Sequence, residues 1–427
     1  MTKRKLREPL EDIKGNLYFD GMPVKELAEK YDTPLYVMSE GRIRDNYNRI
    51  QNALLSNYKY LRIYYAAKAN TNIEVLKILK SEGAFLDTVS PGEVYLGLSS
   101  GYSPDRILYT GTSVRTDELK MMLNANIAIN IDSQSELERL LKIEVPPIIS
   151  IRVNPEIGAG HHNHCITAGS ESKFGLWEED AIKAYSTAKK ARVERFGIHM
   201  HIGSGILDID PFALAVEKLL SIAKRVHDEL GIEFEFIDIG GGFGIPYKPE
   251  EEEFDWTLFS SKVVTLFKTK AKEYALGKPF LCIEPGRFLV CDAVILLTRV
   301  NTLKVTPFHK YLGVDAGFNT LLRPTMYGSY HHILVANKLK KANKESYDVV
   351  GPICESGDSL ARDRSMPEVE EGDLLAVLDA GAYGFSMSSQ YNSRPRPAEI
   401  MIRKGKSVLV RDREQLTDLI GKQRLMD

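Results

Sequence analysis

Hydrophobic and polar residues follow one repeating pattern over much of the chain. From about Tyr60 to Glu284, short apolar runs rich in β-branched residues alternate with stretches in which apolar residues recur every three to four positions. This order is typical of repeated strand–helix units. The predicted strands are Leu61–Ala66, Phe85–Val89, Arg106–Tyr109, Ile127–Ile131, Ile148–Val153, Arg195–His199, Phe234–Ile239 and Phe280–Glu284. The predicted helices include Thr71–Ser81, Thr116–Asn124, Ser133–Lys142, Glu178–Ala191, Pro211–Leu230 and Thr257–Ala275. Eight such units predict an α/β fold, a TIM-type (β/α)8 barrel.

The pattern changes after Glu284, where strand-like runs are separated by glycine and proline turns. These runs are Val294–Val305, Tyr311–Asp315, His332–Lys338, Ser346–Val350, Leu374–Asp379 and Ala398–Arg403. This half of the chain therefore predicts a C-terminal all-β domain. We expect the barrel domain over residues 34–291 and the all-β domain over residues 292–427. Residues 1–33 form an N-terminal segment that packs on either domain.

Composition narrows the classes of partner. The 427 residues contain 56 Lys and Arg against 58 Asp and Glu, so the net charge gives no reason to expect nucleic acid or an anionic membrane. No apolar run approaches a membrane span, and no apolar stretch follows the basic N-terminal residues as it would in a secretory signal. The four cysteines lie far apart, without a C-x-x-C pair. We expect a reduced, cytoplasmic protein that acts on a small molecule.

The first predicted strand ends in a lysine. Residues 65–70 read Tyr-Ala-Ala-Lys-Ala-Asn, which places Lys68 at the mouth of the barrel, where catalytic residues of such barrels lie. Burial lowers the pKa of a lysine amine, so a partly desolvated Lys68 is suited to forming a Schiff base with an aldehyde. The alternative is a lysine that only solvates the strand end.

The sixth predicted strand ends in two histidines, His199 and His201, which face the same side because they are two positions apart. With Asp87 and Asp132 on other strand ends, this spacing would also suit a metal pair. A flat imidazole at this place is equally suited to stacking on a ring. We favour the ring-stacking function for His201 and expect no metal.

The last two strand ends carry glycines and a carboxylate. Gly240–Gly244 follow the seventh strand, and loops at this place commonly bind phosphate because glycine lets backbone N–H groups approach the oxygens. Glu284 ends the eighth strand, and a carboxylate beside a pyridine nitrogen favours the protonated ring, a strong electron acceptor. With Lys68 for an aldehyde and Ser204 for the phosphate, this set predicts pyridoxal 5'-phosphate as the cofactor.

These motifs resemble the alanine-racemase-like barrel family of pyridoxal-phosphate enzymes, and within it the amino-acid decarboxylases, over nearly the whole chain. The segments that resemble family motifs are Tyr65–Asn70, His199–Gly205, Gly240–Gly244, Glu284–Arg287, Cys354–Asp358 and Asp379–Tyr383. The resemblance implies cofactor contacts at Lys68, His201, Ser204, Gly241, Gly242, Glu284, Gly286, Arg287 and Tyr383.

The resemblance also implies a substrate site. Its residues are Arg287, Arg323, Tyr327, Glu355 and Tyr383, with the arginines on a carboxylate and Glu355 on the distal amino group. Guanidinium groups bind carboxylates through paired N–H donors, so two arginines favour a substrate with carboxylates at both ends. The expected reaction is decarboxylation of meso-2,6-diaminopimelate to L-lysine and carbon dioxide, the last step of lysine biosynthesis. The alternative, in which one arginine pairs with a structural carboxylate, stays open.

A homodimer with shared active sites is a further implication of the resemblance. Cys354 is then a catalytic residue, the proton donor, and comes from the other subunit. The segment Pro155–Leu176 resembles the family's mobile loop over the active site. Its histidines, His161, His162 and His164, lack the cysteine-rich or acidic spacing of a metal site, so a place in the loop or on the surface is favoured.

Three other functions stay open at this point. A sister decarboxylase of ornithine, lysine, arginine or carboxynorspermidine would use the same cofactor, and Gly205, where many relatives carry glutamine, leaves the substrate preference unsettled. A racemase of this barrel class is disfavoured because such enzymes typically place arginine where Glu284 stands. A non-catalytic regulator is disfavoured because Lys68, the glycine loop and Cys354 are all retained.

Overall fold

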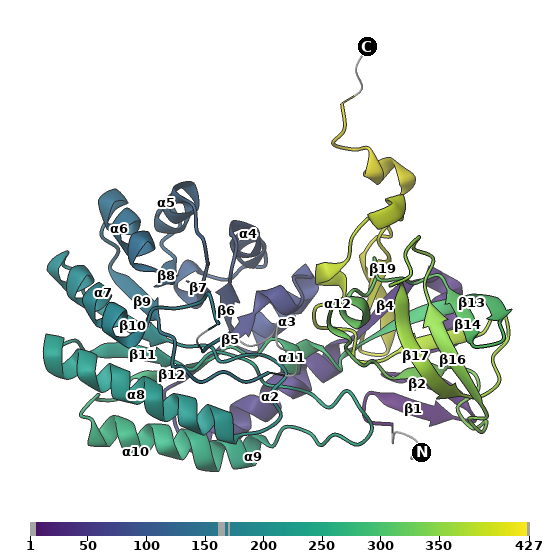
Figure 1. Cartoon of the computed structure of the whole chain (residues 1–427), viewed down its shortest axis with the longest axis horizontal. Coiled ribbons are helices and arrows are strands. Elements are labelled where there is room, and N and C mark those ends of the chain that lie inside the picture. The colour runs from purple at the N-terminus through teal and green to yellow at the C-terminus, as the bar shows by residue number, and fades with distance from the viewer. Residues whose placement is uncertain (1–5, 161–166, 170, 425–427) are drawn as a thin grey trace. The chain divides into compact units, whose positions relative to one another are not determined.

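The computed structural model describes residues 6–160, 167–169 and 171–424 (Figure 1). The chain divides into two compact units. The barrel unit consists of Arg44–Ile245 and Glu252–Leu289, and the β-unit consists of the described parts of Met1–Ile43, Pro246–Glu251 and Val290–Asp427. No helix in the described ranges is both long enough and apolar enough to cross a membrane.

Eight parallel strands close into a barrel in the barrel unit (Figure 1). Around the barrel they follow the order β10, β11, β12, β5, β6, β7, β8 and β9, so strands that are consecutive in the chain are neighbours. They are β5 (Leu61–Ala66), β6 (Phe85–Thr88), β7 (Ile107–Tyr109), β8 (Ala128–Ile131), β9 (Ile148–Arg152), β10 (Arg195–His199), β11 (Phe234–Asp238) and β12 (Phe280–Ile283). Each coincides with a predicted strand to within one residue at either end, and the predicted TIM-type barrel is confirmed.

Helices and short helical turns connect these strands. They are α2 (Glu40–Leu55), η1 (Ala67–Ala69), α3 (Ile73–Ser81), α4 (Pro91–Ser99), η2 (Pro104–Arg106), α5 (Thr116–Asn124), α6 (Gln134–Ile143), α7 (Glu178–Lys190), α8 (Asp210–Leu230), α9 (Trp256–Phe259), the π-helical turn η4 (Ser260–Val264), α10 (Thr265–Glu273) and α11 (Arg287–Val290). Together α9, η4 and α10 occupy the place of the single helix expected over Thr257–Ala275. The sequence pattern does not predict α4.

Two helices begin with the same capping arrangement directly after a barrel strand. At the start of α4, Ser90 Oγ accepts the Glu93 N–H at 3.2 Å, and Glu93 Oε2 accepts the Val89 N–H at 2.8 Å. At the start of α6, Ser133 Oγ accepts the Glu136 N–H at 3.2 Å, and Glu136 Oε2 accepts the Asp132 N–H at 3.1 Å. Each pair satisfies backbone donors that a helix start leaves unbonded. The caps therefore fix the turns that follow β6 and β8.

The barrel interior changes from apolar to polar along its strands. Tyr64, Leu108, Phe236 and Cys282 are buried together as one cluster. Gly197 leaves room for the neighbouring ring, because a Cβ atom there would lie 2.2 Å from Phe236. The buried carboxyl groups of Asp238, Glu284 and Asp87 stand two residues further along the chain than Phe236, Cys282 and Phe85, which packs against this cluster. The apolar cluster thus closes the barrel on one side, and the C-terminal strand ends carry the ionisable groups.

The β-unit contains a nine-stranded sheet and a three-stranded sheet. In the large sheet the order is β17-β16-β14-β13-β4-β19-β20, and β18 pairs with β13 and β15. Its strands are β4 (Leu35–Ser39), β13 (Val294–Val305), β14 (Lys310–Val314), β15 (Ile333–Val335), β16 (Glu345–Val350), β17 (Ser359–Met366), β18 (Leu374–Val377), β19 (Ala398–Arg403) and β20 (Lys406–Arg411). The small sheet consists of β1 (Leu10–Ile13), β2 (Asn16–Phe19) and β3 (Met22–Pro23). The helical elements are α1 (Val24–Tyr31), α12 (Arg323–Tyr327), η5 (Phe385–Met387), η6 (Tyr391–Ser393) and η7 (Leu416–Leu419).

The strand β4 belongs to this large sheet. Val37 pairs with Ile295 of β13 on one side and with Ile400 of β19 on the other. The barrel domain was expected to begin at residue 34, so the assignment of residues 34–43 differs from that expectation. The physical reason is that an apolar run ahead of a helix has the local pattern of a barrel strand, whereas its pairing partners lie far along the chain.

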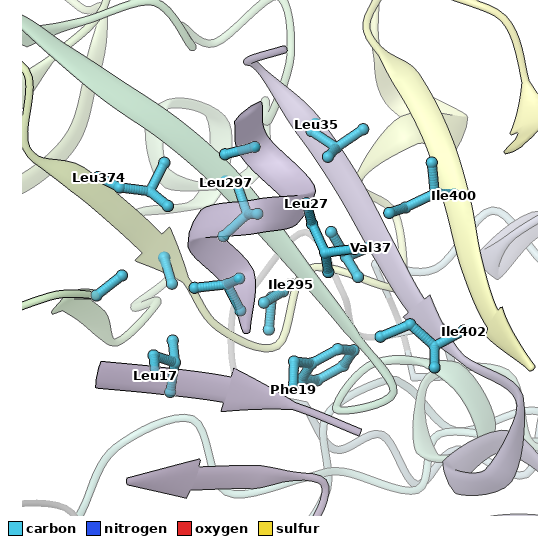
Figure 2. Close-up of a cluster of buried hydrophobic side chains, with 14 of the residues drawn as sticks. Leu17, Phe19, Leu27, Leu35, Val37, Ile295, Leu297, Leu374, Ile400 and Ile402 are labelled. Atoms are coloured by element: carbon cyan, nitrogen blue, oxygen red, sulfur yellow. The ribbon is translucent and has the colours of Figure 1, made fainter. Parts of the chain in front are cut away.

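A cluster of buried apolar side chains forms the core of the β-unit (Figure 2). The side chains labelled in the close-up are Leu17, Phe19, Leu27, Leu35, Val37, Ile295, Leu297, Leu374, Ile400 and Ile402. They come from β2, α1, β4, β13, β18 and β19. Burying one aliphatic side chain of this size stabilises a fold by about 1.5–3 kcal/mol. The described part of the N-terminal segment is therefore held in the β-unit by this core.

Candidate active site

Lys68 lies at the C-terminal end of β5, in the short turn η1. Its Nζ is 2.8 Å from Asp87 Oδ2, at the end of β6. The Asp87 side chain is fully buried, whereas the Lys68 side chain is one-third exposed, at 33%. Burial raises the pKa of Asp87, the charge of Glu284 adds to this effect, and Lys68 opposes it. The contact holds the amine at the barrel end while part of the side chain stays accessible.

Glu284 follows β12 and is almost completely buried beside His199. The two side chains meet through His199 Nε2 and Glu284 Oε2, 3.2 Å apart. Burial alone would raise the pKa of this carboxyl group, but the charge and hydrogen bond of His199, together with Lys68 and His201, outweigh it and lower the pKa to about 2. Glu284 therefore stays ionised near neutral pH.

Asp238, at the end of β11, has a pKa shifted in the opposite direction. Its Oδ1 accepts the Gly240 N–H at 2.8 Å, and the side chain is fully buried. Burial, the neighbouring Glu284 charge and Asp87 raise its pKa well above the usual range, although the Gly240 hydrogen bond opposes this. A carboxyl group with a raised pKa thus stands near one with a lowered pKa. The sequence prediction did not include Asp238, although a carboxylate at a predicted strand end was the signal.

His201 is held by a threonine from the segment after β9. Thr167 Oγ1 donates to the His201 backbone oxygen at 2.9 Å, and the same Oγ1 lies 2.6 Å from His201 Nδ1. Because the hydroxyl has one proton and gives it to the carbonyl, Nδ1 of His201 is the donor in the second contact. Burial, Lys68 and Arg152 lower the pKa of His201 well below its usual range. His201 is therefore a neutral imidazole of fixed tautomer, and Thr167 is a contact that the sequence analysis missed.

The glycine loop after β11 packs tightly against the His201 segment. A Cβ atom on Gly241 would lie 2.2 Å from the Glu284 backbone oxygen, and one on Gly242 would lie 2.4 Å from the Gly203 oxygen. The Gly242 oxygen accepts the Ile206 N–H at 2.9 Å, which joins the two loops. Across the described residues, the N–H groups of Gly241 and Gly242 donate to no protein acceptor. Two backbone donors are thus available at the place where phosphate binding is predicted.

Ser204, Gly286 and Arg287 complete the predicted residues of the barrel unit. Arg287 is buried, and its Nη2 donates to Ser204 Oγ at 3.1 Å. Gly286 packs closely on the turn that carries Lys68, because its Cβ position lies 3.1 Å from the Cβ atoms of Ala66 and Ala69. All eight predicted residues of this unit therefore lie at C-terminal strand ends or in the loops that directly follow them.

The remaining predicted residues belong to the β-unit. Arg323 begins α12 and is almost completely buried, whereas Tyr327 ends that helix and is partly exposed. Cys354 and Glu355 are exposed, and Tyr383 is partly exposed with a left-handed backbone at φ 58°. The Cys354 N–H donates to Asn392 Oδ1 at 2.7 Å, and Tyr391 donates its hydroxyl proton to Glu355. The backbone around the thiol is therefore fixed although the thiol itself is accessible.

Asp358 stabilises the turn that contains Cys354. Its buried carboxyl group accepts the Ile353 N–H and the Phe318 N–H, each at 2.7 Å. Gly317 and Gly351 stand against this carboxyl group, and Cβ atoms there would approach its oxygens to 2.8 and 2.4 Å. The segment Cys354–Asp358 is therefore a tight structural turn that presents its first two side chains outward.

The potential metal ligands that the structure groups with His199 differ from those considered from the sequence. Within the described ranges, the group of potential metal ligands that contains His199 also contains Asp238 and Glu284. It includes neither His201 nor the two carboxylates proposed from the sequence. His161, His162 and His164 lie outside the described residues. The described ends of their segment are joined by hydrogen bonds between Asn154 and Gly169, at 2.9 and 3.0 Å.

Known proteins share both the sequence and the fold. A family model described as pyridoxal-dependent decarboxylase, pyridoxal binding domain, matches residues 40–291. A diaminopimelate decarboxylase from Methanothermobacter thermautotrophicus is 57% identical over 411 residues, which cover 96% of both chains. This chain belongs to the pyridoxal-dependent decarboxylase family. The family predicted from the sequence is confirmed.

Further relatives support the same assignment for this decarboxylase. A diaminopimelate decarboxylase from Archaeoglobus fulgidus is 43% identical and covers 96% of this chain and 97% of its own. The crystal structure of a diaminopimelate decarboxylase from M. jannaschii has a TM-score of 0.91 at 36% identity, with 98% of both chains covered. The structure of the M. jannaschii enzyme with L-lysine has a TM-score of 0.90.

The barrel residues of this decarboxylase fit pyridoxal phosphate. Glu284 Oε1 is buried and accepts no hydrogen bond from any described residue, so a protonated ring nitrogen would supply the missing donor. The free N–H groups of Gly241 and Gly242 would supply donors for a phosphate. Lys68 is a primary amine on the same end of the barrel. The donor and acceptor set therefore corresponds to the ring, phosphate and aldehyde of this cofactor.

Proposed function

We propose that this decarboxylase converts meso-2,6-diaminopimelate to L-lysine and carbon dioxide, the last step of lysine biosynthesis. The observation that carries the proposal is Arg323, a guanidinium that is 1% exposed and forms no ion pair with any carboxylate of the described chain. An isolated buried cation is costly, and a carboxylate of the substrate would compensate it. Relatives named for diaminopimelate support the same substrate. A biosynthetic enzyme of this kind is expected in the cytoplasm.

The barrel residues have separate tasks in this proposal. When bound, pyridoxal phosphate supplies an aldehyde that joins to amines and a ring that accepts the electron pair left when carbon dioxide departs. Lys68 would hold the cofactor, and Glu284 would keep a proton on the ring nitrogen because it remains ionised. Gly241 and Gly242 would bind the phosphate through their N–H groups, and Ser204, Gly286 and Arg287 would contribute further cofactor contacts. His201 would stack on the ring, and Tyr383 would make a further cofactor contact.

The charges of the proposed substrate-binding residues complement those of the substrate. Arg323 and Arg287 bind the distal carboxylate through N–H donors, and Tyr327 adds a hydroxyl. Glu355 and Tyr383 bind the distal amino group and its surroundings. Ornithine, lysine and arginine lack the second carboxylate, so Arg323 would be left without a counter-charge in their complexes. This difference separates the proposed reaction from those of sister decarboxylases.

Cys354 supplies the proton that replaces the lost carboxyl group. Its thiol is exposed on a turn whose backbone is fixed, as we expect of a proton donor that acts in the active site of another subunit. We infer that the enzyme is a homodimer in which Cys354 of one chain serves the Lys68 site of the other. No nucleic acid and no membrane take part in this function.

The direct test measures release of carbon dioxide from a panel of amino acids by the purified enzyme with pyridoxal phosphate. We expect lysine to accumulate from meso-diaminopimelate, and turnover of ornithine, lysine, arginine and carboxynorspermidine to be lower by at least about a hundredfold, the usual effect of an unpaired buried charge. Lys68→Ala is the control without the cofactor amine. Preferred turnover of any diamino acid with a single carboxylate would refute the proposed substrate.

A further inference from the structure

Arg323 is held by an unusual neighbour for a buried guanidinium. Its Nη1 donates to His331 Nε2 at 2.8 Å, and its Nη2 donates to Ser329 Oγ at 3.2 Å. Its Cζ lies 4.8 Å from the centre of the Tyr247 ring. All of these groups belong to the β-unit. A histidine therefore occupies the position at which a structural carboxylate would usually pair with such an arginine.

The two hydrogen bonds of His331 determine its protonation state. A guanidinium can only donate, so Nε2 must carry the lone pair. His331 Nδ1 lies 2.9 Å from the backbone oxygen of Leu378, which can only accept, so Nδ1 carries the proton. The neutral Nδ1–H tautomer is the state that satisfies both contacts. A protonated His331 would set a donor and a second positive charge against the guanidinium.

The backbone around His331 is fixed by the sheet. The Leu378 N–H donates at 2.9 Å to the backbone oxygen of His332, the residue that follows His331. This hydrogen bond lies directly beyond the pairing of β15 with β18. The imidazole is also fully buried and stands edge-on to the Tyr247 ring, at a centroid distance of 5.4 Å. Its ring therefore has little freedom to turn away from Arg323.

We propose that His331 is a positioning residue for substrate selection: its neutral ring holds the Arg323 guanidinium in one orientation, so that the remaining N–H groups meet the distal carboxylate of the substrate. The inference rests on the proposed function. Of the five N–H donors of a guanidinium, His331 and Ser329 engage two. An acceptor without charge leaves the positive charge of Arg323 uncompensated for the substrate, whereas a carboxylate in its place would neutralise it.

The test compares two substitutions that differ by one methylene group. In His331→Gln the amide oxygen reaches the place of Nε2 and still accepts from Arg323. In His331→Asn the shorter amide still donates to the Leu378 oxygen but no longer reaches the guanidinium. We expect the Gln variant to keep the KM for diaminopimelate within about threefold and the Asn variant to raise it by about ten- to a hundredfold, the range for a hydrogen bond to a charged group.

Three further readouts distinguish positioning from a general structural effect. The kcat for diaminopimelate and the residual turnover of lysine, which has no distal carboxylate, should change little in the Asn variant, because the lost interaction binds ground state and transition state alike. Cofactor affinity, followed by absorbance titration, should also be unchanged. His332→Asn is the matched control, since that neighbouring side chain contacts the Tyr330 hydroxyl at 3.0 Å instead, and should keep a normal KM.

Equal losses on both substrates, equal KM values in the Gln and Asn variants, or the same loss in His332→Asn would overturn the inference. Failure of the proposed function would give a different result, because the wild-type enzyme would then not turn over diaminopimelate at all. In that case the positioning role of His331 is tested by calorimetry, which measures the affinity for pimelate, a dicarboxylate of the same length as diaminopimelate. Weaker binding in the Asn variant and normal binding in the Gln variant would support the positioning role, and equal binding would refute it.

Discussion

Two carboxyl groups at the ends of barrel strands have pKa values shifted in opposite directions by their surroundings. Glu284 has a lowered pKa because His199, Lys68 and His201 together outweigh its burial. Asp238 has a strongly raised pKa, because burial and the Glu284 charge act in the same direction. Neighbouring acids whose pKa values are pushed apart in this way can serve different tasks at one pH. The lowered pKa of Glu284 therefore suits it to keep a proton on a ring nitrogen.

Substitution of these two acids by their amides should separate charge from shape. Glu284→Gln removes the negative charge beside the ring, so we expect cofactor binding to persist and kcat to fall by about two to three orders of magnitude, the usual effect of losing one preorganised electrostatic partner. Asp238→Asn replaces a carboxyl group that has a raised pKa with an amide of the same shape and should reduce kcat by less than about tenfold. Steady-state kinetics with absorbance titration of the cofactor measures both. Near-normal turnover in Glu284→Gln would place the ring partner elsewhere.

At this scale the sequence predicts groups that carry chemistry at strand ends and misses groups that act through a neighbour. Lys68 and Glu284 are visible because a charged residue interrupts an apolar run. Thr167 and His331 are not, since their importance lies in contacts with His201 and Arg323 that no local pattern records. The adjacent pair His331 and His332 illustrates this limit, because the two side chains have different partners.

At the scale of elements, prediction succeeded where burial was regular. Barrel strands are buried on both faces and appear as apolar runs, so all eight were found. Helix α4 was missed because Tyr95 and Leu98 are exposed on it, at 71% and 37%, which blurs the helical period. Strand β17 was missed because charged residues fill its middle, and β20 because it is a largely exposed edge strand.

The caps of α4 and α6 make stability depend on pH. Burial raises the pKa of Glu136 to about 7, from an ordinary value of 4.5, and Glu93 has the same shift. Between these pH values the native carboxyl groups keep protons that the unfolded chain has released, so the native state binds more protons and stability falls as pH rises. The contribution is complete below about pH 4.5 and lost as pH rises through about 7.

Glu136→Gln should therefore stabilise the protein at alkaline pH. Glutamine still accepts the Asp132 N–H but does not ionise, so we expect a gain of up to about 3 kcal/mol in the free energy of unfolding at pH 8 and little change at pH 5. Denaturant unfolding at the two pH values measures this difference. Glu138→Gln, on the exposed face of the same helix, is the control and should have no comparable effect. An equal loss of stability at both pH values would contradict the raised pKa.

At the scale of the whole molecule, the residues proposed for the reaction belong to both units. Lys68 and Glu284 are part of the barrel unit, and Arg323 and Cys354 are part of the β-unit. The β-unit is itself assembled from three stretches of chain, since β4 lies between β13 and β19. A local sequence pattern cannot record such distant pairing. For this reason the predicted barrel domain began at residue 34 and included β4, which the structure places in the sheet of the β-unit. Subunit mixing tests the inference that Lys68 and Cys354 of one site come from two chains.

A mixture of two inactive variants tests the shared site. If Lys68 of one chain works with Cys354 of the other, a twofold dimer has two equivalent sites, and Lys68→Ala and Cys354→Ala are each nearly inactive. Random exchange in an equal mixture makes about half of the dimers hybrid, each with one intact site and one site that lacks both groups. Carbon dioxide release should therefore return to about a quarter of the wild-type rate. A mixture that stays inactive, although mass spectrometry proves subunit exchange, would show that the two residues act within one chain or that Cys354 is not the proton donor.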